Sequence, residues 1–192
     1  MNYFIENLNL ATKKISCMLI ILFCSLLAWA ETGWKGKWIS FEQSQSKPNT
    51  WIAYRKEVTL SKKPESLTAR IAADTKYWLW INDRMVVFEG GLKRGPARHA
   101  TYFDEVEIAP YLTEGANTIA VLVWHFGKNG FNHVNSGQAA LLFDARNADT
   151  EIVSDDTWGG MVYEAYQDTE APFPNYRMPE SNIRFDARRE LI

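Results

Sequence analysis

Residues 112–124 read LTEGANTIAVLVW, and this stretch decides the fold class. Gly115 and Asn117 are turn-forming residues. Beyond them, every second residue is a branched aliphatic: Ile119, Val121 and Val123. Successive side chains of a β-strand point to opposite faces, so these three share one face, and the residues between them point the other way. The stretch therefore predicts a turn followed by a β-strand with one aliphatic face.

Similar short runs of period two continue along the rest of the chain. Strands are expected at 51–60, 67–73, 77–81, 84–88, 102–108, 119–124 and 139–143, with shorter ones at 151–154 and 161–166. Asn82-Asp83 suits a tight hairpin turn. Trp78 and Trp80 occupy the second face of 77–81, so we expect both faces of that strand to be covered. With no helical stripe and no βαβ rhythm, the pattern predicts an all-β fold, an antiparallel jelly-roll β-sandwich.

The stretch 1–30 forms a separate segment. Lys13 and Lys14 precede an apolar run over 15–28, and Ala-Trp-Ala at 28–30 gives small residues at the −3 and −1 positions. This is the pattern of a cleavable signal peptide. A signal anchor is the alternative, but the run is shorter than the roughly 20 residues that a bilayer span needs. We expect cleavage after Ala30 and a periplasmic or extracellular protein.

The composition of the remaining stretch, residues 31–192, argues against some classes of binding partner. Both cysteines, Cys17 and Cys24, lie before it, and neither has the small preceding residues of a lipoprotein site. An exported domain without cysteine is held by its core alone. It carries 19 basic and 22 acidic residues without a basic run, so we expect no nucleic acid and, after signal cleavage, no membrane partner. Eight Trp, eight Tyr and ten Phe in the whole chain suit a β-rich core or stacking on sugar rings.

Two long polar loops, 91–99 and 126–137, are the natural places for a site. Their candidate carbohydrate-binding or interdomain residues, with one flanking histidine, are Lys93, Arg94, Arg98, His125, Lys128, Asn129, Phe131, Asn132 and His133. Cations, amides and an aromatic ring are the groups that a sugar site uses. Three interpretations stay open: contact with a following domain of the same chain, sugar binding, and an ordinary solvated loop.

No pattern in the sequence points to catalysis. HExxH, EF-hand and GxSxG motifs are absent. Glu105 and Glu107 would lie side by side on one strand, whereas a glycosidase needs two carboxylates facing each other across a cleft. The three histidines suggest no zinc site, and we expect no cofactor. A structural Ca²⁺ at Asp144 or at Asp155-Asp156 is the one metal site that we consider.

Several motifs carry a family resemblance. The turn and strand at 112–123 resemble the motif of galactose-binding-like jelly rolls at the front of many glycoside hydrolases. Longer stretches resemble the N-terminal domain of bacterial α-L-rhamnosidases, glycoside hydrolase family 78: WIAYRK at 51–56, DTKYWLWIN at 74–82, FEGGLKRGP at 88–96, WHFGKNGF at 124–131 and NIRFDARRE at 182–190. The resemblance covers about residues 34–192.

The resemblance implies a parent enzyme more than an activity of this chain. In that family, inverting hydrolysis of terminal α-L-rhamnose uses an acid and a base in a downstream (α/α)₆ barrel. No position here matches that catalytic motif, so no catalytic residue is expected in this chain. The implied partners are the downstream catalytic domain and rhamnose-containing glycans.

We therefore predict three parts: a signal peptide at 1–30, a jelly roll at 31–166, and a proline-containing linker with the start of a following, missing domain at 167–192. The predicted function is a non-catalytic accessory domain of an exported α-L-rhamnosidase-like enzyme. Two alternatives remain: a free-standing carbohydrate-binding module, and the front domain of a β-galactosidase-type enzyme.

Overall fold

The computed structural model describes residues 33–41, 47–91, 97, 100–130, 134–169 and 183–190. Within them the strands are β1 (Thr50–Leu60), β2 (Thr68–Asp74), β3 (Lys76–Ile81), β4 (Arg84–Gly91), β5 (Asp104–Glu107), β6 (Gly115–His125), β7 (Ala140–Arg146), β8 (Glu151–Val153), β9 (Gly159–Val162), β10 (Tyr166–Asp168) and β11 (Ile183–Phe185). Short 3₁₀ helices lie at Ala109–Tyr111 and Ala187–Arg189. The described residues contain no helix long and apolar enough to cross a membrane.

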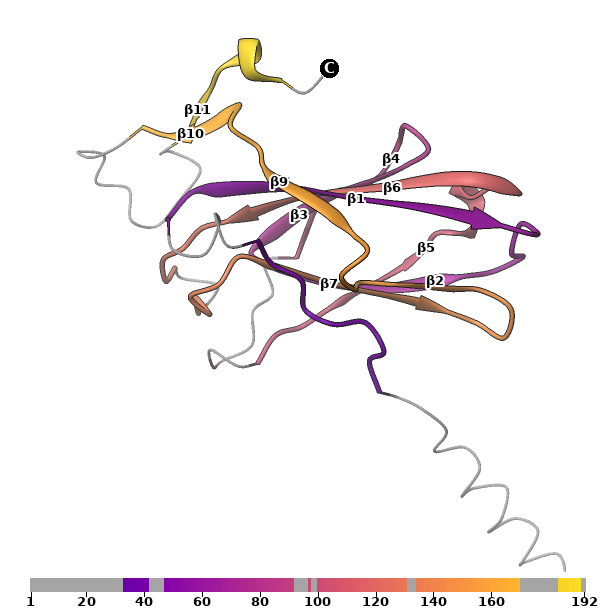
Figure 1. Cartoon of the computed structure of the whole chain (residues 1–192). Helices are drawn as coiled ribbons and strands as arrows, with labels where there is room; N and C mark the ends of the chain where they lie inside the picture. The colour runs from indigo at the N-terminus through magenta and orange to yellow at the C-terminus, as the bar shows by residue number, and fades with distance from the viewer. Residues whose placement is uncertain are drawn as a thin grey trace, which may run out of the picture. The chain divides into compact units, whose positions relative to one another are not determined.

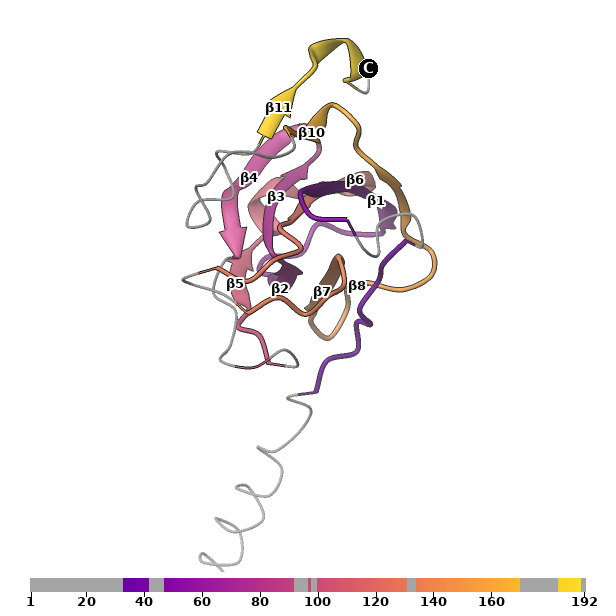
Figure 2. The same cartoon turned by 90° about the vertical axis from the view of Figure 1, so that its left-hand side faces the viewer.

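The described strands form two facing sheets and a separate ribbon. One sheet has the order β4-β3-β6-β1-β9, the other β5-β2-β7-β8, and β10 pairs with β11. Every strand pairing is antiparallel. The five-stranded and four-stranded sheets stack as two layers in Figure 1, and Figure 2 looks along the strands. This is the predicted antiparallel jelly-roll β-sandwich, so the all-β fold class is confirmed.

The core lies between the two sheets, where the predicted period-two faces meet. Ile119, Val121 and Val123 of β6 are at most 1% exposed. They pack in one cluster with the inward residues of neighbouring strands, among them Ile52, Tyr54, Ile71, Tyr77, Leu79, Ile81, Leu141 and Phe143. Full burial of an aliphatic side chain contributes about 1.5–3 kcal/mol relative to exposure. The described part of the chain contains no cysteine, so no disulfide contributes there. The buried core is therefore the main source of the stability of the sandwich.

Two asparagines fix the turns at one end of the five-stranded sheet. Asn82 and Asp83 have φ values of 50° and 61°, which a two-residue hairpin turn of type I′ requires, so the predicted turn is confirmed. The Asn82 amide donates to Asn117 Oδ1 over 2.8 Å. Asn117 in turn bonds to the backbone of Thr113 and Gly115. The Asn117 side chain thus links the predicted turn at 112–117 to the neighbouring β3–β4 hairpin.

An extended strap before β1, residues 35–41, fastens to the four-stranded sheet, and no sequence pattern predicted it. Ile39 and Leu141 exchange two backbone hydrogen bonds of 2.9 and 3.0 Å. The buried Asp144 accepts bonds from the backbone N–H groups of Lys35 (2.6 Å) and Gly36 (3.1 Å). Ile39 and Phe41 pack against the core. The strap therefore closes one margin of the interior.

The β10–β11 ribbon lies on the outer side of the five-stranded sheet, away from the four-stranded sheet (Figure 1). Tyr166 stacks on Trp51, with 5.1 Å between ring centroids, and Ile183 packs against the same aromatic cluster. The sequence assigns 167–192 to a linker and the start of a following domain, and that division stays a prediction. Within this segment Ile183 packs against the sandwich, whereas Arg188 and Arg189 of the 3₁₀ helix are exposed.

Candidate functional site

The two predicted site loops leave β4 and β6 at the same end of the sandwich, where β2 also turns into β3 (left in Figure 1). The structure describes only parts of them: Gly91, Ala97, 126–130 and 134–137. Six of the predicted site residues lie outside the described residues: Lys93, Arg94, Arg98, Phe131, Asn132 and His133. Their roles stay predictions.

A buried carboxylate anchors the second of these loops. Asp74, the last residue of β2, is 1% exposed. The backbone N–H of Ser136 donates to Asp74 Oδ2 over 3.2 Å, and the Ser136 hydroxyl donates to the same oxygen. Thr75 Oγ1 donates to Asp74 Oδ1 over 2.9 Å. Hydrogen bonds to a carboxylate are among the stronger ones in a protein, so Asp74 holds the loop against the end of β2.

Three predicted binding residues belong to the described part of this loop and its border. His125 is 1% exposed, and its Nδ1 lies 3.3 Å from the Asp74 carbonyl oxygen. Lys128 and Asn129 border a shallow hollow of about 350 Å³ together with Val134 and Asn135. Asn129 Oδ1 already accepts a 2.9 Å bond from the Asn135 N–H. Asn129 therefore helps to order the loop, and the buried His125 lies against the end of β2.

A second carboxylate anchors the start of the first loop. Asp104 Oδ2 accepts from the backbone N–H of Gly91 over 2.8 Å and from the Tyr77 hydroxyl over 3.0 Å. Burial, and then the negative charge of Asp104, raise the pKa of Tyr77, so the phenol stays a proton donor. Gly91 has φ +82°, and an added Cβ would lie 2.6 Å from the Thr75 carbonyl oxygen. Only glycine fits this position.

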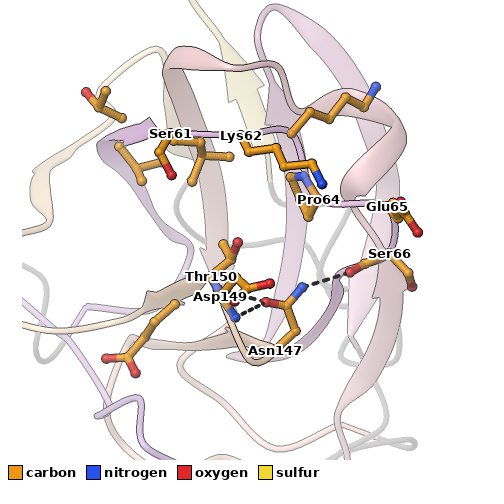
Figure 3. Close-up of a pocket in the computed structure, with 13 residues that line it drawn as sticks. Ser61, Lys62, Pro64, Glu65, Ser66, Asn147, Asp149 and Thr150 are labelled. Atoms are coloured by element: carbon orange, nitrogen blue, oxygen red, sulfur yellow. Dashed lines mark hydrogen bonds between the residues drawn. The ribbon is translucent and has the colours of Figure 1, made fainter.

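The opposite end of the sandwich holds a larger hollow of about 560 Å³, shown in Figure 3. Ser61, Lys62 and Pro64 lie on one side of it. On the other, Asn147 donates to the Ser66 carbonyl over 3.1 Å and accepts from the N–H groups of Asp149 and Thr150. Its described lining includes no aromatic ring, so it offers no platform for a sugar. The Asn147 side chain therefore links the β7–β8 connection to the β1–β2 connection.

The carboxylates of β5 do not form an acid–base pair. Glu105 and Glu107 are both exposed on the same strand, as predicted. Glu107 accepts bonds from the N–H groups of Leu67 (2.7 Å) and Ala109 (3.0 Å). Partial burial acts to raise the pKa of Glu107, but the hydrogen bonds from Leu67, Ser66 and Ala109 outweigh it and lower the pKa. A glycosidase acid needs the opposite shift.

The described residues contain no group of three or more His, Cys, Asp or Glu side chains that could hold a metal ion. Two of the three carboxylates considered for Ca²⁺, Asp144 and Asp155, are engaged with protein donors. Asp144 bonds to the strap and accepts from Arg146 Nε over 2.7 Å. Asp155 accepts from the Thr157 N–H over 3.0 Å. Neither offers the open cluster of oxygen ligands that Ca²⁺ needs.

The site residues predicted from the sequence do not include the outer face of the five-stranded sheet. Trp78 of β3 stands opposite Leu122 of β6, and Leu122 stands opposite Ala53 of β1. Ala53 in turn stands opposite Met161 of β9. Phe88 of β4 meets Trp78 edge-on, with 6.4 Å between ring centroids. An apolar row thus crosses all five strands on the side away from the core.

A neighbouring row, nearer to the β3–β4 turn, is also largely apolar. Met85 stands opposite Trp80, and Trp80 opposite Ala120. We call the two rows together the outer patch: Ala53, Trp78, Trp80, Met85, Phe88, Ala120, Leu122 and Met161. Phe88 is 70% exposed, Met85 49% and Met161 47%. The signal was present in the sequence, because the strands at 77–81 and 119–124 both carry apolar residues on their second face.

The ribbon covers the next row of the same face. Trp51 and Trp124 stack there, with centroids 4.9 Å apart, and Tyr166 of β10 lies on Trp51. Trp51 and Trp124 are each 2% exposed. Lys76 places its ammonium 5.6 Å from the centre of the Trp124 ring and 3.3 Å from Glu89 Oε2. The outer face therefore has a covered aromatic part under the ribbon and the open outer patch beside it.

Comparison with solved structures identifies the architecture. The glycoside hydrolase family 78 rhamnosidase of Bacillus sp. GL1 matches 71% of this chain at 25% identity, with a TM-score of 0.61. The match covers 14% of that enzyme. The α-L-rhamnosidase from Dictyoglumus thermophilum matches 69% of the chain at 19% identity, with a TM-score of 0.53 and 17% of that enzyme covered. No family model and no curated protein matches the chain.

The chain resembles one domain of the α-L-rhamnosidases. The predicted resemblance to the α-L-rhamnosidases is thereby confirmed. The rhamnosidase-like domain corresponds to a small part of each enzyme, since it spans 14% and 17% of their lengths. Most of each of those enzymes therefore lies outside the matched region.

Proposed function

We propose that this chain is a non-catalytic accessory domain of an exported α-L-rhamnosidase-like glycoside hydrolase. The observation that carries the proposal is the match to the Bacillus sp. GL1 rhamnosidase over 71% of this chain but 14% of the enzyme. A domain that recurs as one small part of a much longer enzyme acts beside the catalytic part. Its partners would be that catalytic part and, through the two long loops, rhamnose-containing glycans.

The arrangement of carboxylates supports a non-catalytic role. Inverting glycosidases need two carboxyl groups about 6.5–9.5 Å apart on opposite sides of the sugar ring. Glu105 and Glu107 share one strand and face solvent, while Asp74 and Asp104 are engaged in anchoring the loops. Of these four carboxylates, Asp74, Asp104 and Glu107 therefore serve structural roles.

Hydrolysis and binding tests separate this proposal from its rivals. The purified chain is incubated with an aryl α-L-rhamnoside, with the Bacillus sp. GL1 rhamnosidase as the positive control. We expect no release of the aryl alcohol, and release would overturn the non-catalytic role. Calorimetry with rhamnose-containing polysaccharides tests for a free-standing carbohydrate-binding module. Sequencing the gene beyond the codon for Ile192 tests for the parent enzyme, because an in-frame stop there would exclude a longer product.

Export has its own test. The tripartite pattern over residues 1–30 supports cleavage after Ala30 and release into the periplasm or beyond. We expect the mature protein in the periplasmic or culture fraction to begin at Glu31, as read by N-terminal sequencing. A protein that still begins at Met1 and stays with the membrane would contradict export by a cleavable signal.

A further inference from the structure

The outer patch exposes large apolar side chains on the free face of an antiparallel sheet: Met85, Phe88 and Met161 are between 47% and 70% exposed. Such a sheet usually alternates apolar residues toward the core with polar residues toward water. Here the outward positions across five strands are occupied by Trp78, Leu122, Ala53 and Met161, with Phe88 beside them. Contiguous exposed apolar surface on a soluble domain commonly marks an interaction site.

Charged residues beside the patch are paired with each other. Arg55 of β1 stands opposite Ala120, and its guanidinium is 2.7 Å from Glu57 Oε1. On the other side, Lys76 lies 3.3 Å from Glu89 Oε2. An apolar centre with a polar margin is the usual organisation of a protein–protein interface.

The neighbours of the rings favour a protein over a glycan. A sugar stacks on a ring face and needs hydrogen-bonding groups placed around it. The residues around Trp78 and Trp80 are instead Met85, Leu122 and Ala120, which offer dispersion contacts without side-chain hydrogen bonds. Methionine adapts its shape to an apolar partner surface. The patch therefore fits the apolar surface of another protein domain.

The position of the β10–β11 ribbon indicates which protein domain binds the outer patch. β10 and β11 already pack on the adjoining row, where Tyr166 stacks on Trp51 and Ile183 joins the aromatic cluster. Polypeptide following β11 would therefore begin beside the outer patch. The rhamnosidase of Bacillus sp. GL1 has most of its chain outside the matched region. Resting on the function proposed above, we propose that the outer patch is the surface on which the catalytic part of the enzyme docks.

Cysteine labelling tests this docking surface. Phe88→Cys places a thiol in the patch. The matched control, Tyr102→Cys, uses an aromatic residue that is 60% exposed just before β5, in the other sheet. Both are made in a Cys17→Ser, Cys24→Ser background. The rate of reaction with a maleimide is measured in the 192-residue chain and in the longer product of the gene. We expect Phe88→Cys to react at least about tenfold more slowly in the longer product, because labelling then requires the interface to open. Tyr102→Cys should react equally in both.

The outcomes distinguish this inference from the function on which it rests. Equal labelling of Phe88→Cys in both proteins would overturn the docking surface and leave the accessory role intact. Absence of any longer product on an immunoblot would overturn both. Two other results would assign the patch to a different occupant. One is slow labelling in the 192-residue chain together with a dimer by light scattering. The other is protection by a rhamnose-containing polysaccharide.

Discussion

The two faces of the five-stranded sheet are both apolar, yet only one is closed by the rest of the sandwich. The inner face carries Tyr77 and Leu79 of β3, which are fully buried against the four-stranded sheet. The outer face carries Trp78 and Trp80 of the same strand, which are only partly buried. Apolar character alone therefore does not identify the core. The inner face accounts for the stability of the domain, and the outer face carries the proposed docking surface.

The largest contrast should come from truncating one side chain on each face. Leu79→Ala removes a side chain with no exposed surface, and such changes cost about 2–5 kcal/mol because a cavity remains. Leu122→Ala, on the half-exposed outer face, should cost less than about half as much, since little surface is lost from a packed interior. Urea unfolding followed by tryptophan fluorescence measures both. Equal losses would mean that the two faces are equally buried in solution.

Low pH should weaken the attachment of the strap, residues 35–41, because it protonates Asp144. Burial acts to raise the pKa of this carboxyl, but the hydrogen bonds from Arg146, Gly36 and Lys35 outweigh it and lower the pKa. A carboxyl whose pKa is lowered on folding stabilises the folded state above its unfolded pKa, near 3.9, and loses that contribution as the pH falls through the folded value.

Asp144→Asn tests this link between the strap and the core. The substitution leaves hydrogen bonds to the strap weaker and should cost about 1–3 kcal/mol at pH 7. It should also flatten the fall in melting temperature below pH 4, measured by circular dichroism. Asp83→Asn, at an exposed turn residue, is the matched control for the loss of one carboxylate. An unchanged acid limb in Asp144→Asn would show that the strap is held by other contacts.

A smaller effect is expected where the ribbon covers the outer face. Tyr166→Ala removes the ring that stacks on Trp51 and contacts Phe185, with centroids 5.1 and 4.8 Å apart. Ring pairs of this kind contribute about 0.5–1.5 kcal/mol beyond their buried area. Amide hydrogen exchange should therefore accelerate over Ile183–Phe185 while β1 and β6 remain protected. Equal acceleration in all three strands would mean that the ribbon is an integral part of the sandwich.

The sequence predicted the inner face better than the outer one, for a physical reason. Period two is a local property, so the alternation of Ile119, Val121 and Val123 and the Asn82-Asp83 turn were readable without knowledge of the fold. Which sheet covers which face depends on contacts between distant segments. The strap at 35–41 has no such alternation, and its position follows from bonds to Asp144, more than a hundred residues away.

The candidate site was harder to predict than the fold for a related reason. The site was predicted in the loops at 91–99 and 126–137 because their cationic and amide side chains can donate hydrogen bonds to a sugar. The outer patch has no polar signature at all. Its members come from five strands and become neighbours only through the register that places Trp78 beside Leu122 and Ala53 beside Met161. The outer patch can therefore be recognised only when the pairing of the strands is known.

The smallest expected effect is the most direct test of the open face. Phe88→Ser changes a side chain that is 70% exposed, so the free energy of unfolding of the 192-residue chain should shift by no more than about 0.5 kcal/mol. The same change should reduce the binding of a hydrophobic dye, measured by fluorescence, because it removes the most exposed ring of the patch. A loss of stability comparable to that of Leu79→Ala would mean that Phe88 is covered in solution. The outer face would then be part of the core.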